Sequence, residues 1–340
     1  MKRALITGAT GQDGAYLSRM LLEKGYEVHG THGPAAHEDL GRLRELGIDR
    51  DVRLTAVDLG DAATLRETVE TVAPHEVYNL AAQSFVAASF EKPVVTAEVN
   101  AMGTLRLLEA VRSLGSDVRY YQASSGDMFG TVETIPQSES TPFRPRSPYA
   151  VAKLFAHWMT VTYREAHGMF ACSGILFNHE SPLRGIEFVT RKISSGIANL
   201  KLGGQGRLRL GNLDARRDWG YAADYVEAMW LMLQQDEAAD YVIATGETHS
   251  VREFVDAACR AAEIDLEWQG SGLDERGINR RTSDIIVEIS EAFFRPSEVN
   301  QLVGDASKAR RVLGWQPQTR FDDLVALMVE ADLRRLTRAS

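Results

Sequence analysis

A chain of 340 residues, 44% hydrophobic and 25% charged, has an ordinary globular composition and is long enough for about two domains, or for one large domain with an appendage. Its formal net charge of −9 disfavours nucleic acid as a partner, because a phosphate backbone attracts basic proteins. No apolar stretch approaches the length that spans a bilayer, so we expect no membrane association.

Strands and helices are expected to alternate along the first half of the chain. The short apolar run at 3–7 predicts a buried strand, and further strands are expected at 27–31, 53–57, 76–82 and 118–125. Apolar residues at helical spacing predict helices at 12–24, 63–72, 99–115 and 147–167. This alternation is typical of a parallel sheet with helices on both faces and right-handed crossovers.

A glycine-rich loop joins the first expected strand to the first expected helix. Gly8, Gly11 and Gly14 form a GxxGxxG segment, which also holds Gln12 and Asp13. Glycine permits the tight turn and lets backbone N–H groups approach a pyrophosphate, and the helix N-terminus adds a favourable dipole. Glycine triplets also occur in plain strand–helix turns, but the position after the first strand of an alternating chain favours binding of NAD(P).

Further candidate ligand contacts follow the third and fourth expected strands. Asp58 and Leu59 come directly after the third strand and are candidates for holding the adenine ring. The residues after the fourth strand are candidates for lining the cofactor and the substrate, namely Leu80, Ala81, Gln83 and Ser84. Ligands bind at the carboxyl ends of strands in such sheets, although ordinary strand-end packing explains these positions equally well on its own.

The strongest local signal is Tyr149 followed four residues later by Lys153, because this spacing places both on one face of a helix. Pro148 suits the first turn of that helix. A neighbouring ammonium favours the phenolate, which takes a proton from a hydroxyl while a hydride passes to the cofactor. A lone YxxxK is usually a solvated helix face, but here it follows the fifth strand of a dinucleotide-binding pattern, so we predict a catalytic role.

The fifth expected strand ends in two further candidate catalytic residues. Ser125 is placed to hydrogen-bond the reacting hydroxyl. Asp127 is a carboxylate near the same site and therefore a candidate acid or base, with capping of the loop backbone as its alternative role.

These patterns predict an α/β fold with a Rossmann-type doubly wound parallel sheet and a smaller, mixed α/β C-terminal region. The alternation weakens beyond about residue 180, where loops lengthen. We assign 1–180 to an NAD(P)-binding domain, to which some later segments return. We assign 181–340 mainly to a region that covers the carboxyl edge of the sheet and holds the substrate.

Long strings resemble the GDP-mannose 4,6-dehydratase family from residue 1 to about 338, among them GATGQDGAYL, VYNLAAQSFV, TPFRPRSPYAVAKL, GILFNHESPLRGIEFVTRKI and RRDWGYAADYVEAMWLMLQQD. The resemblance implies oxidation of the sugar at C4 by bound NAD(P)+, loss of water across C5–C6 and return of the hydride to C6. The implied product is GDP-4-keto-6-deoxy-mannose, and the implied partner is a GDP-sugar.

The resemblance also implies roles for individual positions. The catalytic set has counterparts in the family at Ser125, Asp127, Tyr149 and Lys153. Cofactor contacts are implied at His179 and Arg184. Binding of the nucleotide-sugar is implied at Asn178, Lys192, Arg217 and Arg295, to which we add Ser84 from the strand end.

One departure from the family concerns the base. Where the family has Ser/Thr-Ser-Glu, this chain has Ser125-Gly126-Asp127, so the carboxylate is one methylene shorter and Gly126 is expected to leave room for a bulkier C6 substituent. An alternative is therefore a GDP-sugar 4-epimerase, 4-dehydrogenase or 4-reductase that acts without dehydration, including on a heptose or longer sugar. A third hypothesis is a non-catalytic sugar-nucleotide-binding protein, which has no need for an aligned Ser125, Tyr149 and Lys153.

A second departure follows the second strand. The family places paired arginines there to hold the 2′-phosphate of NADP, whereas this chain has THGPAAH at 31–37 and no arginine until Arg42. Because a bidentate phosphate clamp is missing, we expect NADP or NAD as cofactor with a lean to NAD.

Two further features bear on setting and assembly. Cys172 and Cys259 stand far apart and outside any CxxC or Cys/His cluster, so we expect no disulfide, no metal site and a reducing, cytoplasmic setting. By resemblance, helices at 99–115 and 147–166 form a four-helix dimer interface, so we expect a homodimer or a homotetramer.

Overall fold

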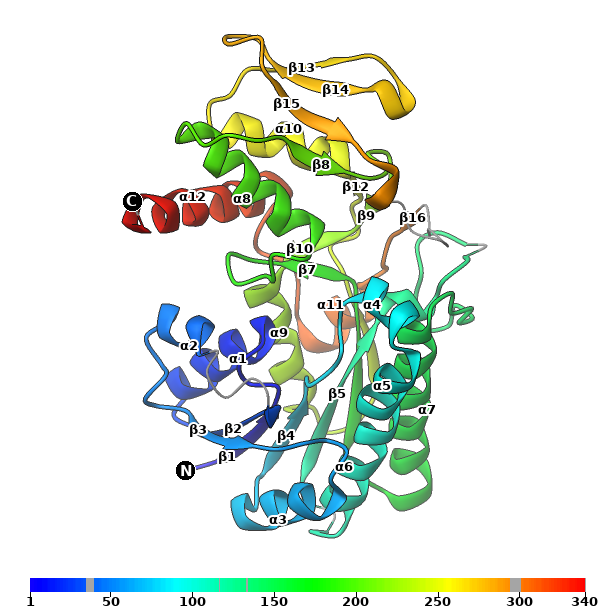
Figure 1. The fold of residues 1–340 in the computed structure, drawn as a ribbon. Coiled ribbons are helices and arrows are strands. Elements are labelled where there is room, and N and C mark those ends of the chain that lie inside the picture. The colour runs from blue at the N-terminus through cyan, green and yellow to red at the C-terminus, as the bar shows by residue number, and fades with distance from the viewer. Residues whose placement is uncertain (35–39, 116, 133, 294–300, 340) are drawn as a thin grey trace.

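A parallel sheet forms the core of the lower lobe (Figure 1). The structure, a computed structural model, describes residues 1–34, 40–115, 117–132, 134–293 and 301–339. Within these ranges seven strands pair in parallel in the order β3 (Arg53–Ala56), β2 (Glu27–His32), β1 (Arg3–Thr7), β4 (Glu76–Asn79), β5 (Arg119–Ser125), β6 (Ala171–Leu176) and β11 (Asp240–Ile243). The strand order reverses between β1 and β4, so the carboxyl ends of these two strands flank a crevice.

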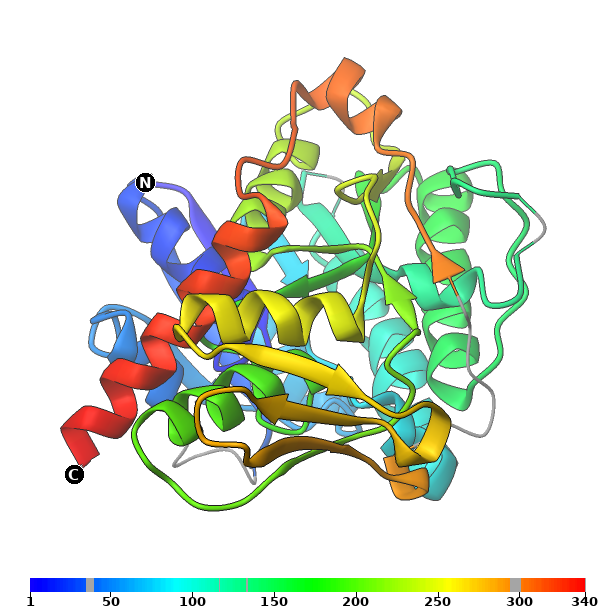
Figure 2. The ribbon, with the colours of Figure 1, turned by 90° about the horizontal axis from the view of Figure 1, so that it is seen from above.

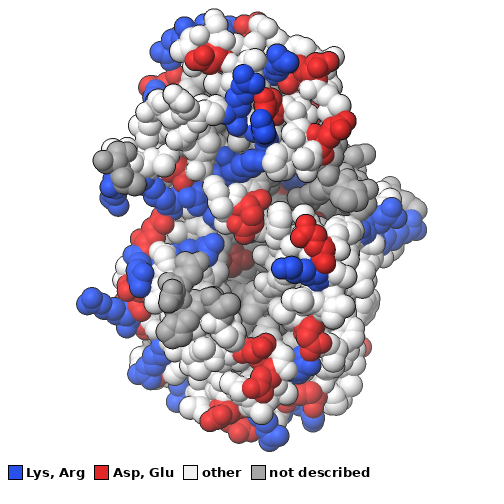
Figure 3. Space-filling view, viewed as in Figure 1, with Lys and Arg blue, Asp and Glu red and all other residues white. Residues whose placement is uncertain are grey.

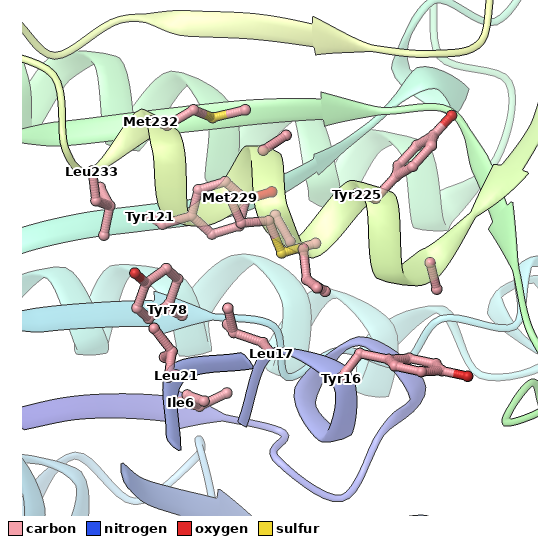
Figure 4. Packing of buried hydrophobic residues seen from close by; sticks show 14 of the residues in the cluster. Ile6, Tyr16, Leu17, Leu21, Tyr78, Tyr121, Tyr225, Met229, Met232 and Leu233 are labelled. Atoms are coloured by element: carbon pink, nitrogen blue, oxygen red, sulfur yellow. The ribbon is translucent and has the colours of Figure 1, made fainter. Parts of the chain in front are cut away.

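Helices cover both faces of the sheet, which confirms the predicted doubly wound α/β fold. One face is covered by α1 (Gln12–Glu23) and α9 (Ala222–Met232), and Leu17, Tyr78 and Met229 belong to the core between them (Figure 4). The other face is covered by α3 (Ala62–Val72), α6 (Gly103–Arg112) and α7 (Pro148–His167). Burial of both sheet faces leaves β6 buried at every residue, whereas β3 at the edge of the sheet is mostly exposed.

Two expected elements differ in their bounds. The fourth strand was expected at 76–82 but ends at Asn79, because the backbone N–H groups of Leu80 and Ala81 both donate to Thr7 Oγ1 at 3.1 Å instead of joining the ladder. The helix expected at 99–115 begins as a π-helical turn, Glu98–Met102, before α6 continues it. A short pair of helices, α4 (Val86–Glu91) and α5 (Pro93–Ala97), precedes that turn.

The upper lobe packs three helices against a mixed sheet (Figures 1 and 2). The helices are α8 (Val189–Lys201), α10 (Val251–Ala261) and α12 (Phe321–Ala339). The sheet has the order β13 (Leu266–Gln269), β14 (Arg276–Asn279), β15 (Ile285–Ile289) and β8 (Leu208–Leu210). Their shared core includes Ile193, Val255, Val287 and Met328, each fully buried.

Small sheets join the two lobes. One pairs β7 (Asn178–Glu180) with β10 (Trp219–Tyr221), and the other has the order β12 (His249–Ser250), β9 (Arg216–Arg217) and β16 (Gln301–Leu302). Besides β11 and α9, α11 (Ser307–Leu313) packs on the lower lobe from the second half of the chain. No helix of the described ranges is long and apolar enough to cross a membrane.

Candidate active site

The glycine loop is packed too tightly for side chains at two positions. Gly8 has a φ of +72°, and a Cβ there would lie 2.9 Å from Ala81 Cα. A Cβ on Gly14 would lie 2.3 Å from Gly8 O and 2.6 Å from Ala9 Cα. The loop therefore leaves backbone N–H groups, with no side chain above them, at the start of α1, which is a fitting cradle for a dinucleotide phosphate.

Gln12 and Asp13 tie this loop to β7. The Gln12 amide donates to His179 O at 3.1 Å and accepts from Ser181 Oγ at 2.8 Å. Asp13 Oδ2 lies 2.8 Å from His179 Nε2, while His179 Nδ1 lies 2.7 Å from Phe177 O. Burial opposes charge on both partners, but their mutual attraction raises the pKa of His179 and lowers that of Asp13, which favours an ion pair.

Tyr149 and Lys153 share one buried face at the start of α7. The helix begins here because Ser147 Oγ accepts from Ala150 N at 3.1 Å and Pro148 occupies the first turn. Lys153 Nζ donates to Ala123 O at 3.0 Å and lies 5.9 Å from the centroid of the Tyr149 ring. The two side chains are thus fixed beside the end of β5.

The electrostatic balance at the phenol differs from the expected one. Burial, followed by the Asp127 carboxylate, raises the pKa of Tyr149, whereas Ser125 and Arg184 act to lower it. Burial also lowers the pKa of Lys153 to about 8. In the chain alone, the Lys153 ammonium therefore does not produce the lowered phenol pKa that the spacing suggested, because desolvation dominates both groups.

Ser125, Gly126 and Asp127 leave β5 through a short 3₁₀ turn, Gly126–Met128. Ser125 Oγ accepts from Asp127 N at 3.2 Å. A Cβ on Gly126 would lie 3.3 Å from the ring of Phe177, whose exposure is only 2%. The expectation that Gly126 opens room for a bulkier substituent is therefore wrong, because the Phe177 ring already occupies that space.

One cleft brings most of the predicted residues together, in the hollow between the lobes that Figure 3 shows. Its lining includes Asp13, Leu80, Ser84, Ser125, Asp127, Tyr149, Lys153, Asn178, His179, Arg184 and Arg217. The carboxylate, the phenol and the ammonium therefore face the same space as the side chains expected to hold the cofactor and the sugar.

Other predicted residues lie outside this lining. Asp58 Oδ1 accepts from Gly60 N at 2.8 Å in an exposed turn, and Leu59 is buried beside Gly103. The Asn100 side chain holds the Gln83 backbone: Gln83 N donates to Asn100 Oδ1 at 2.8 Å, and Asn100 Nδ2 donates to Gln83 O at 3.0 Å.

The remaining predicted substrate contacts lie nearer the upper lobe. Lys192 Nζ lies 3.4 Å from the centroid of the Phe293 ring, and burial lowers its pKa. Arg217 donates to Arg216 O at 2.7 Å and still lines the cleft. Arg295 lies outside the described residues.

Besides Phe177, two aromatic residues of the cleft were not predicted. Phe85 follows β4 and Phe188 precedes α8, and their ring centroids lie 5.7 Å apart in an edge contact between the two lobes. The Arg184 guanidinium lies 3.5 Å from the centroid of the Phe188 ring. Phe85 directly follows the predicted Ser84, so position at a strand end was an available signal, whereas nothing in the sequence separates Phe188 from ordinary packing.

Comparisons with known proteins agree over the whole chain. The family model described as GDP-mannose 4,6 dehydratase matches residues 5–328. The chain is 51% identical to a GDP-mannose 4,6-dehydratase of Vibrio cholerae, over 98% of this chain and 94% of that protein. It is 53% identical to GDP-mannose 4,6 dehydratase 2 of Arabidopsis thaliana, over 99% and 88%. The solved structure of DesIV, a dTDP-glucose 4,6-dehydratase from Streptomyces venezuelae with NAD and TYD bound, superposes with a TM-score of 0.83 at 25% identity, over 99% and 98%.

Proposed function

This chain belongs to the GDP-mannose 4,6-dehydratase family, NAD(P)-using hydro-lyases, and we propose that it converts GDP-mannose to GDP-4-keto-6-deoxy-mannose in the cleft between its lobes. One observation carries the assignment of the chemistry to residues. A carboxylate, Asp127, and a phenol, Tyr149, line the same cleft beside Lys153 and the glycine loop. Oxidation at C4 needs the phenol, and elimination across C5–C6 needs the carboxylate.

The glycine loop fits the cofactor, since any side chain at Gly8 or Gly14 would collide with the backbone that forms the cradle. The Gly11 N–H donates to Gly8 O at 3.0 Å and so holds the turn, which would leave the first N–H groups of α1 to meet the phosphates, and Lys153 would face the nicotinamide side of the cleft. When bound, the nicotinamide takes a hydride from C4 of the sugar and later returns it to C6.

We propose NAD as the preferred form of the cofactor. Arg42, the first arginine after β2, donates to two backbone carbonyls, Leu183 O at 2.8 Å and Thr10 O at 3.3 Å. A guanidinium directed at carbonyls is poorly arranged for a bidentate phosphate clamp. Dissociation constants for NAD+ and NADP+ measured on the wild-type protein test this, and tighter binding of NADP+ would reverse the assignment.

The proposed proton transfers return every side chain to its starting protonation state at the end of one turnover. Tyr149 takes the proton of the 4-hydroxyl while C4 is oxidised, and Ser125 hydrogen-bonds the same oxygen. The new ketone acidifies the C5–H bond, so Asp127 removes that proton and passes it to the C6 hydroxyl, which leaves as water. Tyr149 then returns its proton to C5 as C6 is reduced, and one water is lost in total.

The buried position of these groups suits the sequence of steps. Tyr149 and Lys153 are 9% and 5% exposed, so little water competes for their protons. Burial, and after it the Asp127 carboxylate, raises the pKa of Tyr149, so its phenolate is a strong base toward the 4-hydroxyl.

Mass spectrometry of GDP-mannose incubated with the protein and NAD+ or NADP+ tests the activity. We expect a product lighter by one water with no net reduction of the cofactor. A product that keeps its C6 oxygen would contradict the assignment and would favour a 4-epimerase or a 4-reductase.

We also propose a homodimer, or a homotetramer built from it, through the outer surface of α5 and α7. Large apolar side chains are exposed there: Val94 is 78% exposed, Val151 55% and Trp158 53%. A groove lined by Pro93, Met102 and Phe155 runs between the same helices. Contiguous exposed apolar surface of this kind marks an interface between proteins, and sedimentation of a monomer would contradict the proposal.

A cytoplasmic location is proposed on chemical grounds. Cys172 and Cys259 are both buried and unpaired. Burial raises the pKa of each thiol, to about 11 for Cys172 and about 12 for Cys259. Free thiols are typical of a reducing compartment.

A further inference from the structure

The segment from Ser181 to Arg184 leaves β7 and carries the Arg184 side chain into the cleft. Its three carbonyl groups at 182–184 all accept hydrogen bonds from guanidinium groups. Arg191 of α8 donates to the carbonyls of residues 182 and 184, both at 2.9 Å. Arg335 of α12 donates to the carbonyl of residue 182 at 2.7 Å, and Arg42 of α2 (Gly41–Glu45) to that of residue 183 at 2.8 Å.

A buried carboxylate holds two of these arginines in place. Asp332 is 2% exposed and accepts from Arg191 Nε at 3.0 Å, from Arg335 Nη1 at 2.9 Å and from Ser194 Oγ at 2.7 Å. A carboxylate so deeply buried is stable only when it is paired and hydrogen-bonded. Arg335 also pairs with Glu45, so the last helix of the upper lobe is joined to α2 of the lower lobe.

The same group of contacts reaches the glycine loop. Arg42 donates to Thr10 O at 3.3 Å in addition to its contact with Leu183. Ser181 Oγ donates to the Gln12 side chain at 2.8 Å. The segment that carries Arg184 is therefore fixed on one side by α8 and α12 and on the other by the loop that forms the cofactor cradle.

We propose that Arg42, Arg191 and Arg335, with Asp332 as shared counter-ion, form an arginine clamp that positions Arg184 in the cleft and couples it to the glycine loop. The inference rests on the proposed function of that cleft. None of the four clamp residues lines the cleft, so they are positioning residues. Arg184 itself is further held by an ion pair with Glu180 at 3.0 Å.

The clamp predicts a change in the acidity of Tyr149. The charged and titratable groups that line the cleft together with the phenol are Asp127 from the 3₁₀ turn, Lys153 from the helix of Tyr149, Asp13 from α1, His179 from β7, Arg217 from β9, and Arg184. Among them Arg184 lowers the pKa of Tyr149, whereas Asp127 and Asp13 raise it. Displacement of Arg184 therefore raises the pKa of Tyr149 further, and the rise of activity with pH moves to higher pH.

Arg335→Ala and Asp332→Asn test the clamp, with Arg334→Ala as the matched control. Arg334 is the neighbouring residue, 60% exposed and paired only loosely with Glu330 at 3.6 Å. For each purified protein we would measure GDP affinity by calorimetry with the cofactor present, cofactor affinity by fluorescence, and kcat/KM for GDP-mannose against pH.

We expect both clamp variants to lose roughly tenfold in cofactor affinity or in kcat/KM and to show the shifted pH profile, because small misplacement of a binding group costs on this order or more. The control should match the wild type in every measurement. Folded clamp variants that keep the wild-type affinities and pH profile would overturn the proposal. If the wild type binds GDP but does not convert GDP-mannose, the proposed function fails. The ligand affinities of the variants, compared with those of the wild type, still test the clamp.

Discussion

Replacing Lys153 by methionine, Lys153→Met, separates the catalytic use of a buried ammonium from its effect on stability. Burial lowers the pKa of Lys153 from 10.5 to about 8, so charging it costs more in the folded chain than in the unfolded chain. Below pH 8 this difference lowers the free energy of unfolding of the wild type by roughly 3 kcal/mol. The variant also leaves Ala123 O without the ammonium that donates to it at 3.0 Å, which offsets about 1 to 2 kcal/mol. We therefore expect the free energy of unfolding of Lys153→Met to exceed that of the wild type by about 1 to 2 kcal/mol at neutral pH.

The sign of the pH dependence follows from linkage. The folded-state pKa of Lys153 is depressed, so between about pH 8 and 10.5 the unfolded chain binds more protons than the folded chain, and wild-type stability gains on the variant as pH rises. The advantage of Lys153→Met is therefore complete below about pH 8, and by about pH 10.5 it gives way to a deficit of about 1 to 2 kcal/mol, because the desolvation penalty is gone and the lost hydrogen bond to Ala123 O remains. Turnover should be lost at every pH.

Urea unfolding of both proteins at neutral pH and near pH 10, at one protein concentration, measures this difference. Lys201→Met is the control, because Lys201 lies near the surface and pairs with exposed Glu263 at 3.0 Å, and it should bring no gain. A Lys153→Met protein that is less stable than the wild type at neutral pH, or whose advantage is the same at both pH values, would refute the reasoning.

Three further substitutions probe the cleft and its cradle. Tyr149→Phe should lower kcat by about a thousandfold with GDP affinity retained in calorimetry, since only the proton acceptor is lost. Asp127→Asn should allow oxidation at C4 but not elimination, so reduced nicotinamide should accumulate in absorbance measurements; full turnover with release of water would contradict the role of this carboxylate. Gly14→Ala should weaken cofactor binding at least tenfold in fluorescence titration, because its Cβ would lie 2.3 Å from Gly8 O, and unchanged affinity would show that the cradle is not where the phosphates bind.

The sequence predicted the first five strands because each is a short run set between turns or helical patterns. The sixth was not predicted, because Ser173 and Gly174 interrupt the apolar residues of β6. Packing explains this glycine, since a Cβ there would lie 2.4 Å from Tyr121 Oη. The last strand of the sheet, β11, lies some sixty residues further along the chain, and no local pattern indicates which sheet it joins.

The residues of the site also divide into those that a local sequence pattern predicts and those that depend on tertiary packing. Tyr149 and Lys153 follow from helical spacing, which is local. The Phe177 ring over Gly126 and the clamp around Asp332 depend on how β6, α8 and α12 pack, and side chains far apart in sequence leave no joint signal in one chain.

The mass of the product formed from GDP-mannose in water enriched in deuterium oxide tests the proposed dehydration at C5–C6. We expect loss of one water, one deuterium incorporated at C5 and no net reduction of the cofactor, because Tyr149 delivers to C5 the solvent-exchanged deuteron of the 4-hydroxyl while the hydride returns to C6. A product that keeps its C6 oxygen, or net reduction that matches the amount of sugar converted, would contradict it.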